Sequence, residues 1–566
     1  MRWKINTSAS ASTVNKLIDE LNIDKVNATL LAQRNITNFD AARNFFRPAY
    51  DQLHDPFLMK DMDKAISRIQ TALQNNEKIL VFGDYDVDGT TAVALVYGYL
   101  KTTGAQVRYY IPDRYSEGYG ISFKGIDYAA ENDYSLVIAL DCGIKANDKI
   151  DYANSKNIDF IICDHHLPGE ELPKAYAVLD PKRKDCSYPY KELSGCGIGY
   201  KLIQAFLKAT EQSEEILEDY IDLVAVSIAA DIVPITGENR VLAHFGLKKL
   251  NTLSRPGFRS IIDLNKFKKD LTITDLVFVI APRINAAGRI EHGSKAVELL
   301  VSDTMQKAEA VAKGINVTNL QRKDLDQAIT AEAIEMIEAN AELSTKKSTV
   351  VYHEDWHKGV VGIVASRLVE KFYRPTIVLT KSNGKITGSA RSVKDFDVYE
   401  AIDACSELLE QFGGHKYAAG LTLAPENMQL FSDKFEQVVR ASITDDLLIP
   451  EQEIDLEINF NDIGSKFFRV LKQFAPHGPG NMTPVFVSDN VLDTGYAKIV
   501  GNNHLKLELY QNENPAVKFA AIAFDKGDYL SHFKKRLPLK VCYTINENEW
   551  NGLKSVQLMV KEFQLI

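Results

Sequence analysis

Short apolar runs alternate with helix-like stretches in the first half of the chain. Three runs, residues 78–83, 136–140 and 159–163, are almost continuously apolar, which is typical of strands buried on both faces of a sheet. A helix-like stretch, residues 90–100, follows the first run closely. Strands that alternate with helices in this way predict a parallel α/β sheet over residues 71–235.

The hydrophobic pattern changes three times along the rest of the chain. Residues 304–341 have the period of one or two long amphipathic helices, and a second strand–helix unit begins near residue 348. Residues 504–510 and 555–560 alternate between apolar and polar positions, which is typical of a small β-barrel. The fold class is therefore α/β, with two α/β lobes joined by long helices and followed by a separate barrel. The predicted domains are an N-terminal extension (1–70), the first lobe (71–235), a helical connector (236–342), the second lobe (343–445) and the barrel (446–566).

The composition is that of a globular protein with several domains. The chain has 566 residues, of which 45% are hydrophobic and 25% are charged. No apolar run is long enough to cross a bilayer and the N-terminus lacks an apolar signal core, so we expect a cytoplasmic protein. The six cysteines show no paired C-x-x-C spacing, which argues against a disulfide scaffold and a structural zinc site.

The net charge of −10 argues mildly against a nucleic-acid-binding protein, for which a basic balance is expected. An acidic metal site would inflate this negative count, however, and the charge that matters for binding is local. One basic cluster is present at Lys534, Lys535, Arg536 and Lys540. Most clusters of this kind are solvated surface, so this one is weak support for nucleic-acid binding.

Acidic and histidine residues stand where the three apolar runs end. Carboxyl ends of neighbouring parallel strands meet in one crevice of an open sheet, so these side chains should converge. One aspartate after a strand would mean little, because aspartate favours turns. Three such groups predict a site for two Mn²⁺ or Mg²⁺ ions, since hard oxygen ligands mixed with imidazole suit these metals. The seven residues are Asp84, Asp86, Asp88, Asp141, Asp164, His165 and His166.

The spacing within these groups suggests individual roles. Asp86 and Asp88 are two residues apart, so an extended loop would point both carboxylates the same way. Asp141 can bridge two ions with its two oxygens, and His165 can bind through a neutral imidazole. His166 would then be free to face the substrate. Asp231 ends an apolar helix before Pro234 and is a further ligand candidate, although it could equally be a helix-terminal cap partner.

Two other regions combine small residues with groups that bind anions. Glycine and alanine permit close backbone approach, and arginine can hold a phosphate through two hydrogen bonds. Tight helix packing with a surface salt bridge would explain either region alone. Beside a metal centre, phosphate binding becomes the favoured interpretation. The residues concerned are Arg283, Asn285 and Arg289 in the first region and Ser389, Arg391 and His415 in the second.

The segment His353-Glu-Asp-Trp-His357 matches the H-E-x-x-H pattern of zinc proteases. That pattern requires a helix, which places both imidazoles on one face. Here the preceding residues are strand-like, and Gly359 follows in a loop. We therefore do not expect a zinc-protease site.

The chain resembles the DHH phosphoesterases. Gly83-Asp-Tyr-Asp-Val-Asp-Gly89, Leu140-Asp-Cys-Gly143, Asp164-His-His166 and Ala230-Asp-Ile-Val-Pro234 are similar to the four motifs of this family. Trp356-His-Lys-Gly-Val-Val-Gly, Gly388-Ser-Ala-Arg-Ser and Gly413-Gly-His-Lys-Tyr-Ala-Ala-Gly420 are similar to its DHHA1 domain. Together with the barrel-like tail, which resembles an OB-fold, the order of motifs is similar to the bacterial single-strand-specific exonucleases of the family.

This resemblance implies a two-metal 5′→3′ exonuclease that releases mononucleotides from single-stranded DNA during repair and recombination. The ligand positions are occupied by Asp86, Asp88, Asp141, His165 and Asp231. Related proteins often have an imidazole where this chain has Phe82, so Asp84 is expected to contribute to the chemistry instead. His166 would contact the scissile phosphate, while Arg289, Ser389 and Arg391, with Arg114, would hold the terminal 5′-phosphate. The resemblance also implies a monomer, with a single-strand-binding protein and a helicase as partners.

Two alternatives use the same fold. A DHH phosphodiesterase for nanoRNA, phosphoadenosine phosphate or cyclic dinucleotides would resemble only the two central lobes, whereas the tail here favours a long strand. A non-catalytic replication scaffold would be expected to lack several ligands, yet all the core motifs are present.

Overall fold

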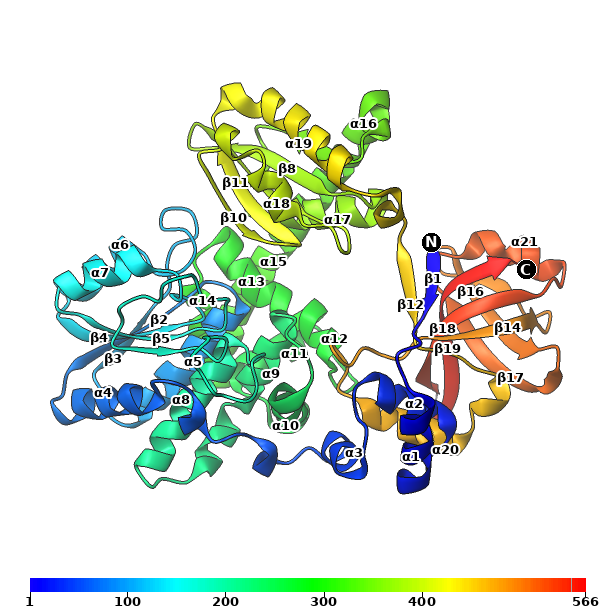
Figure 1. Cartoon of the computed structure of the whole chain (residues 1–566), viewed down its shortest axis with the longest axis horizontal. Helices are drawn as coiled ribbons and strands as arrows, with labels where there is room; N and C mark the ends of the chain where they lie inside the picture. The colour runs from blue at the N-terminus through cyan, green and yellow to red at the C-terminus, as the bar shows by residue number, and fades with distance from the viewer. Residues whose placement is uncertain (551, 566) are drawn as a thin grey trace.

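The computed structural model describes residues 1–550 and 552–565, which form three bodies (Figure 1). The first lobe contains a five-stranded parallel sheet in the order β3-β2-β4-β5-β6. Its apolar strands are buried on both faces, because Ile79 and Val81 of β2 belong to one hydrophobic core and Leu80 and Phe82 to the other. The strands are β2 (Lys78–Gly83), β3 (Val107–Tyr110), β4 (Tyr134–Leu140), β5 (Asp159–Cys163) and β6 (Ala177–Leu179).

Helices cover both faces of this sheet. On one face lie α6 (Phe123–Glu131) and α7 (Asn147–Ser155), whose apolar residues join the core with Leu80 and Phe82. The opposite face is covered by α4 (Met62–Gln74), α5 (Val87–Thr102), α8 (Gly195–Ala209) and α9 (Ile221–Ala230). The predicted parallel α/β sheet is therefore confirmed.

The helical connector shares the core of the first lobe, to which Leu242, Phe258 and Ile284 all belong. The 35-residue helix α15 then carries the chain to the second lobe, where Ile329 and Ile337 pack in another core. The connector helices are α10 (Gly237–Leu253), α11 (Pro256–Leu264), α12 (Ile273–Asp275), α13 (Ala281–Ile290), α14 (Ser294–Leu300), α15 (Met305–Ala339) and α16 (Ala341–Thr345).

The second lobe has a mixed five-stranded sheet in the order β10-β11-β9-β8-β7. Only the β7–β8 pair is parallel. The strands are β7 (Thr349–Tyr352), β8 (Thr376–Ser382), β9 (Lys385–Arg391), β10 (Gln411–His415) and β11 (Ala418–Leu423). The helices are α17 (Val361–Phe372), α18 (Val398–Asp403) and α19 (Met428–Ser442).

The C-terminal lobe is the predicted barrel. Its sheet has the order β13-β14-β18-β19-β17-β16-β15, and an additional β14–β16 pairing joins strands from its two sides. The strands are β13 (Leu456–Glu457), β14 (Phe486–Asp493), β15 (Lys498–Val500), β16 (His504–Gln511), β17 (Asn514–Ala523), β18 (Leu539–Trp550) and β19 (Leu553–Leu565). Two short helices, α20 (Ser465–Leu471) and α21 (Leu530–Lys534), accompany them.

The N-terminal residues do not form a unit of their own. Helices α1 (Ala11–Leu21), α2 (Lys25–Gln33) and α3 (Phe39–Phe46) share a core with the C-terminal lobe, in which Leu17 and Leu31 pack with Phe467 and Phe474. Strand β1 (Arg2–Ile5) pairs in parallel with β12 (Glu451–Ile454), which leads from the second lobe into the barrel. The expected 1–70 extension is thus divided, because the apolar faces of α1–α3 are buried by residues more than 400 positions away. The expected barrel domain is likewise not self-contained.

Among the described residues, no helix is long and apolar enough to cross a membrane.

Candidate metal centre and phosphate-binding face

The loop after β2 contains Asp84 and Asp86, and both side chains are fixed by backbone hydrogen bonds. Asp86 caps α5 by accepting a hydrogen bond from the Gly89 N–H at 3.0 Å. Gly89 must be small, since a Cβ there would lie 2.5 Å from the carbonyl oxygen of Asp84. Asp84 is fully buried and accepts a hydrogen bond from the Gly120 N–H at 3.1 Å, while its Oδ2 atom has no partner among the described residues.

Asp88 is fixed by the N-terminus of α8. The backbone N–H groups of Gly195 and Cys196 donate to its carboxylate at 2.7 and 2.8 Å. The Ser227 hydroxyl of α9 donates to the same carboxylate at 2.7 Å. These three hydrogen bonds hold the Asp88 side chain in a defined orientation.

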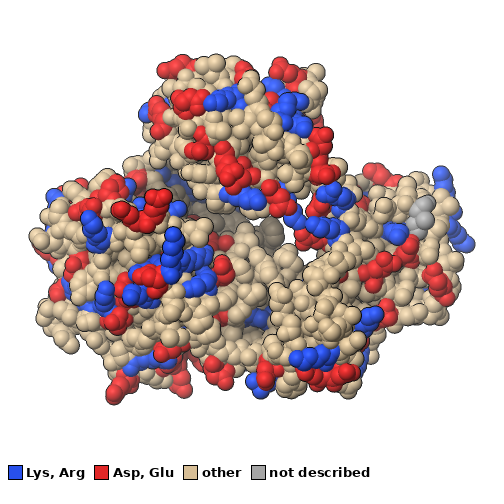
Figure 2. Space-filling view, viewed as in Figure 1, with Lys and Arg blue, Asp and Glu red and all other residues tan. Residues whose placement is uncertain are grey.

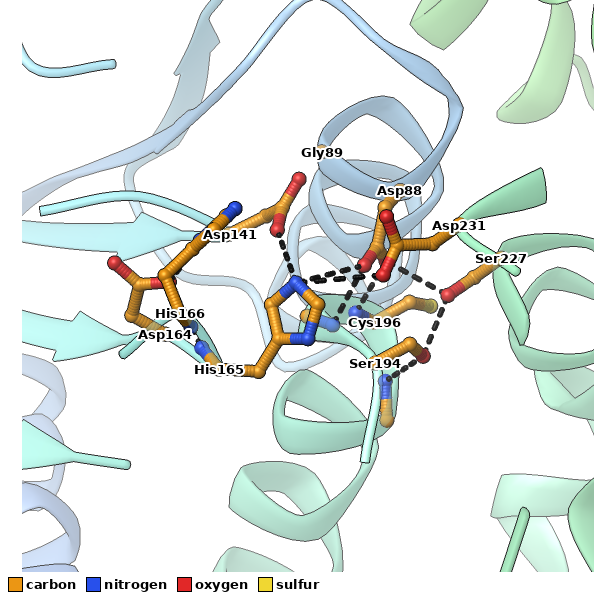
Figure 3. A network of polar contacts seen from close by, with 12 residues as sticks. Asp88, Gly89, Asp141, Asp164, His165, His166, Ser194, Cys196, Ser227 and Asp231 are labelled. Atoms are coloured by element: carbon orange, nitrogen blue, oxygen red, sulfur yellow. Dashed lines mark hydrogen bonds and ion pairs between the residues drawn. The ribbon is translucent and has the colours of Figure 1, made fainter. Parts of the chain in front are cut away.

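His165 lies at the centre of the site, with carboxylates from three elements around it (Figure 3). Its Nε2 atom is 3.2 Å from Asp141, 3.5 Å from Asp231 and 3.7 Å from Asp88. Asp141 has a left-handed backbone, with φ of 59°, directly after β4. A Cβ on Gly195 would lie 2.8 Å from the Asp141 carboxylate, so glycine is needed for this close approach.

Asp164 orients His165 and His166 through hydrogen bonds. It accepts hydrogen bonds from the backbone N–H of His165 at 2.8 Å and from Nδ1 of His166 at 2.7 Å. Burial alone would raise the pKa of Asp164, but hydrogen bonding and charge from His166 lower it to about 2. Burial lowers the pKa of His166, yet the bond to Asp164 more than compensates and the pKa rises to about 9. In the metal-free protein this pKa favours the imidazolium form of His166 at neutral pH, and the side chain is 45% exposed.

Three carboxyl groups of the site, Asp231, Asp141 and Asp84, have raised pKa values in the metal-free protein. Burial, followed by the charges of Asp88 and Asp86, raises the pKa of Asp231 to about 8. Burial and neighbouring carboxylates also raise the pKa of Asp141 and of Asp84 well above the usual range. Crowded carboxylates of this kind are stabilised by a bound cation.

The donor set fits divalent cations. Two groups have ligand atoms within 4.8 Å of one another, Asp141 with His165 and His166, and Asp88 with His165 and Asp231. Oδ1 of Asp141 and both ring nitrogens of His165 are buried without hydrogen-bond partners among the described residues. Asp86 stands outside these groups but contributes to the charge that raises the pKa of Asp141.

Arg289 of the connector and Arg391 of the second lobe form a second, cationic cluster. Nη1 of Arg391 donates to the Ser389 hydroxyl at 2.7 Å, and Nη1 of Arg289 donates to the Gly359 carbonyl at 3.0 Å. Within the described chain, neither arginine has a carboxylate within 4 Å, and both line a cavity of about 510 Å³. Burial, then the charges of Arg114, Arg391 and Arg322, lowers the pKa of Arg289 to about 9. Unpaired, mutually repelling guanidinium groups are suited to bind phosphate.

The remaining predicted residues are placed differently. Arg283 donates to the Val279 carbonyl at 2.6 Å and to Asn316 at 3.3 Å, so its guanidinium is engaged within the connector. Asn285 is half-buried on the same helix, α13. His415 is exposed on β10, where burial and then the charges of Arg391 and His166 lower its pKa. His415 thus belongs with the face between the two lobes, whereas Arg283 contributes to connector packing.

Two features of the site have no obvious sequence signal. The hydroxyl of Tyr119 donates to the Asp141 carbonyl at 3.2 Å and lies 3.4 Å from Nε2 of His166. The hydroxyl groups of Ser194 and Ser227 are hydrogen-bonded at 2.6 Å, which positions Ser227 for its hydrogen bond to Asp88. By contrast, residues 353–357 form a loop rather than a helix, in agreement with the rejection of a zinc-protease site.

The space-filling view shows a hollow at the centre of the molecule, with both basic and acidic side chains on its rim (Figure 2). The first lobe, the second lobe and the C-terminal lobe surround this hollow.

The fold and the site define a phosphoesterase of the DHH class. Residues 78–228 match the DHH family, N-terminal domain, residues 345–441 match the DHHA1 domain, and residues 454–562 match the RecJ OB domain. The single-stranded-DNA-specific exonuclease RecJ of Bacillus subtilis is 36% identical over 99% of this chain and 70% of its own length. RecJ of Escherichia coli is 30% identical over 89% of this chain and 90% of its own length. The chain belongs to the RecJ family.

Solved structures agree with this assignment. The crystal structure of Thermus thermophilus RecJ in complex with Mn²⁺ has a TM-score of 0.85 at 25% identity, over 100% of this chain and 79% of that one. A structure of exonuclease RecJ bound to manganese has a TM-score of 0.60 at 30% identity, over 70% of this chain and 97% of that one.

Proposed function

We propose that this protein is a single-stranded-DNA-specific exonuclease that hydrolyses phosphodiester bonds from the 5′ end and releases 5′-mononucleotides. The observation that carries the proposal is the buried carboxylate–imidazole centre, whose donor set suits divalent cations. Arg289 and Arg391, which have no ion-pair partner within 4 Å in the described chain, suit the phosphate of a strand end. The relatives named above, single-stranded-DNA-specific exonucleases, support the substrate class.

The centre would hold two ions of Mn²⁺ or Mg²⁺ through Asp86, Asp88, Asp141, His165 and Asp231. Such ions supply Lewis-acid stabilisation of phosphate charge and lower the pKa of water. Asp84 keeps one oxygen free to bind a cation or accept a proton.

The protein's own groups orient the substrate. His166 is cationic and exposed, so its Nε2–H can donate to the scissile phosphate while Asp164 holds the ring. Arg289, Arg391 and Ser389 would bind the terminal 5′-phosphate. Arg114, which stacks 4.8 Å from the Tyr85 ring, would approach from the first lobe.

The C-terminal lobe would hold the strand away from the metal centre, as OB-folds do through a basic groove and aromatic stacking. The proposal extends to a monomeric enzyme of DNA repair and recombination, located in the cytoplasm, that acts beside a single-strand-binding protein and a helicase.

The direct test is digestion of oligonucleotides labelled at the 5′ or the 3′ end, in single-stranded and double-stranded form, with Mn²⁺ or Mg²⁺. We expect a 5′-labelled single strand to yield labelled mononucleotide at once, while the 3′-labelled strand shortens progressively. The duplex should persist. Release of mononucleotide first from the 3′ end, or equal digestion of duplex, would contradict the proposal.

A second measurement separates this activity from a small-substrate phosphodiesterase. Metal-free protein should bind a long single strand far more tightly than a dinucleotide, and the affinity should fall as salt rises. Each phosphate contact contributes a log–log slope of about −0.7 for a single strand. Equal affinity for both ligands, with no salt slope, would favour the phosphodiesterase.

A further inference from the structure

The turn between α9 and α10 carries Asp231 and is held in an unfavourable conformation. Ile232, the next residue, has φ of 58°, which β-branched residues rarely adopt. Its side chain is 63% exposed, so the packing of Ile232 does not impose this conformation. Strained residues persist only where the surrounding structure over-determines them. The restraint must therefore act through the neighbouring residues of the turn.

A loop of the C-terminal lobe supplies that restraint. The backbone N–H of Ile235 donates to the Pro479 carbonyl at 2.7 Å. Gly478 and Gly480 lie in close contact with the turn. A Cβ added at Gly478 would lie 2.5 Å from Ile235, and one added at Gly480 would lie 2.8 Å from Thr236. This loop, residues 475–481, is the proline- and glycine-rich Ala-Pro-His-Gly-Pro-Gly-Asn segment.

The loop is itself rigidly docked on the first lobe. Arg240 is 4% exposed, and its guanidinium donates to the carbonyls of Phe474 at 2.9 Å and Ala475 at 3.0 Å. Further bonds reach the carbonyls of Phe45, Gln473 and Pro476. A buried guanidinium whose hydrogen bonds go to several carbonyls of one loop fixes that loop with little freedom.

Residues packed with the first lobe form hydrogen bonds to the other side of the turn. The Tyr190 hydroxyl donates to the Pro234 carbonyl at 3.2 Å, and the Asn239 amide donates to the same carbonyl at 3.0 Å. The turn is therefore clamped between its own lobe and the C-terminal lobe. Only Ile232 and Val233 separate these clamped residues from Asp231.

We infer that the 475–481 loop is a positioning element for the metal site: it holds the strained turn so that Asp231 faces His165. This inference rests on the proposed function, in which Asp231 is a metal ligand. It gives the C-terminal lobe a role in catalysis besides binding the strand. If the clamp loosens, Ile232 can relax to an ordinary conformation and the adjacent Asp231 turns away.

The test uses Gly478→Ala in the full-length protein, which adds one methyl group against Ile235. Gly464→Ala is the matched control in the same lobe, since no heavy atom lies within 4 Å of a Cβ at that position. Mn²⁺ binding to the metal-free proteins is measured by titration calorimetry. We expect Gly478→Ala to weaken Mn²⁺ binding by ~10–100-fold, the range for groups that orient ligands. Gly464→Ala should match the parent.

Two additional variants make the result decisive. Tyr190→Phe removes the hydroxyl bond to Pro234 without altering the loop, and it should weaken Mn²⁺ binding in the same direction. It also decides the question if Gly478→Ala does not fold. Asp231→Ala reports on the ligand assignment itself.

Parental Mn²⁺ affinity in folded Gly478→Ala and Tyr190→Phe, with weakened binding by Asp231→Ala, would overturn the positioning role and leave the proposed function standing. Parental affinity in Asp231→Ala would overturn both the ligand assignment and the inference. Loss of single-strand affinity alone, with Mn²⁺ binding unchanged, would show that the loop only attaches the C-terminal lobe.

Discussion

Oδ1 of Asp141 lies 3.2 Å from Nε2 of His165, and neither atom has a hydrogen-bond partner in the described chain. Two buried polar atoms without partners are unfavourable unless a ligand satisfies them. His165 is also the residue common to both candidate ligand groups, while Asp141 was predicted to bridge two ions. The pair therefore forms the part of the centre where loss of one group should affect both ions.

Asp141→Asn tests this part of the centre. The amide keeps the shape of the side chain but removes the charge that binds a cation, so hydrolysis should fall by several orders of magnitude. The metal-free variant should melt above the metal-free parent, because folding no longer requires protonation of a buried carboxyl group whose pKa is raised. Single-turnover kinetics and thermal melting measure the two effects. Near-parental turnover by a folded, metal-saturated variant would contradict the assignment.

The metal-free protein should lose stability as the pH rises. Asp231 has a folded pKa of about 8, far above its usual value, and His166 has a folded pKa of about 9. A raised pKa means that the folded state binds more protons than the unfolded state, so stability falls with increasing pH. The contribution of Asp231 is lost as pH rises through about 8, and that of His166 as pH rises through about 9.

Melting temperatures of metal-free protein between pH 5 and pH 9 measure this decline. Saturating Mn²⁺ should flatten it, because the cation replaces the protons. In Asp231→Asn the part of the decline below pH 8 should become shallower. A metal-free melting temperature that rises steadily over this range would be inconsistent with the crowded centre.

Arg289 and Arg391 should affect substrate binding rather than metal binding. Replacing either by alanine removes charged hydrogen bonds to phosphate, each worth about 1.5–3 kcal/mol. The affinity for a 5′-phosphorylated strand should fall accordingly, with Mn²⁺ affinity unchanged. Arg259→Ala is the matched control, since this arginine is 56% exposed and paired with Asp263 on the connector. Collapse of Mn²⁺ binding in Arg391→Ala would refute the assigned role.

The shared core predicts that an N-terminal substitution disturbs the C-terminal lobe. Leu31 is fully buried with residues of that lobe, so Leu31→Ala should destabilise it by about 2–5 kcal/mol. Long single strands should bind more weakly, while a very short oligonucleotide should still be hydrolysed. Leu430→Ala, at a leucine that is 60% exposed, is the control. Unchanged unfolding and strand binding in Leu31→Ala would contradict a common core.

The same packing changes what can be learned by deleting the tail. Removing residues after 450 would uncover α1–α3 and leave the buried guanidinium of Arg240 without four of its carbonyl partners. Point variants are therefore better tests of the C-terminal lobe than truncation.

Local patterns were sufficient to predict that several acidic and histidine side chains would lie together. Asp88, Asp141 and His165 follow apolar strands, and parallel strands bring their carboxyl ends together whatever the rest of the fold. Asp231 was recognisable as an acid among buried apolar neighbours. Their side chains converge on one point, as that pattern predicts.

Other features depend on contacts that no local pattern encodes. Arg283 and Arg289 share one helix, and only tertiary packing determines which of them has free donors. Ser227 supports Asp88 from 139 residues away. The division of the N-terminal residues between two lobes likewise depends on partners that are distant in the chain, so a short amphipathic helix does not reveal which lobe it will cover.

The shared core of α1–α3 and the C-terminal lobe has a consequence during synthesis. These helices leave the ribosome first, but their partners Phe467 and Phe474 follow more than 400 residues later. At elongation rates of roughly 5–20 residues per second, the apolar side chains of Leu17 and Leu31 stay exposed for tens of seconds before their partners are synthesised. During that interval the nascent chain exposes a hydrophobic surface that chaperones can bind. The first lobe can therefore fold before helices α1–α3, which precede it in the chain, are packed.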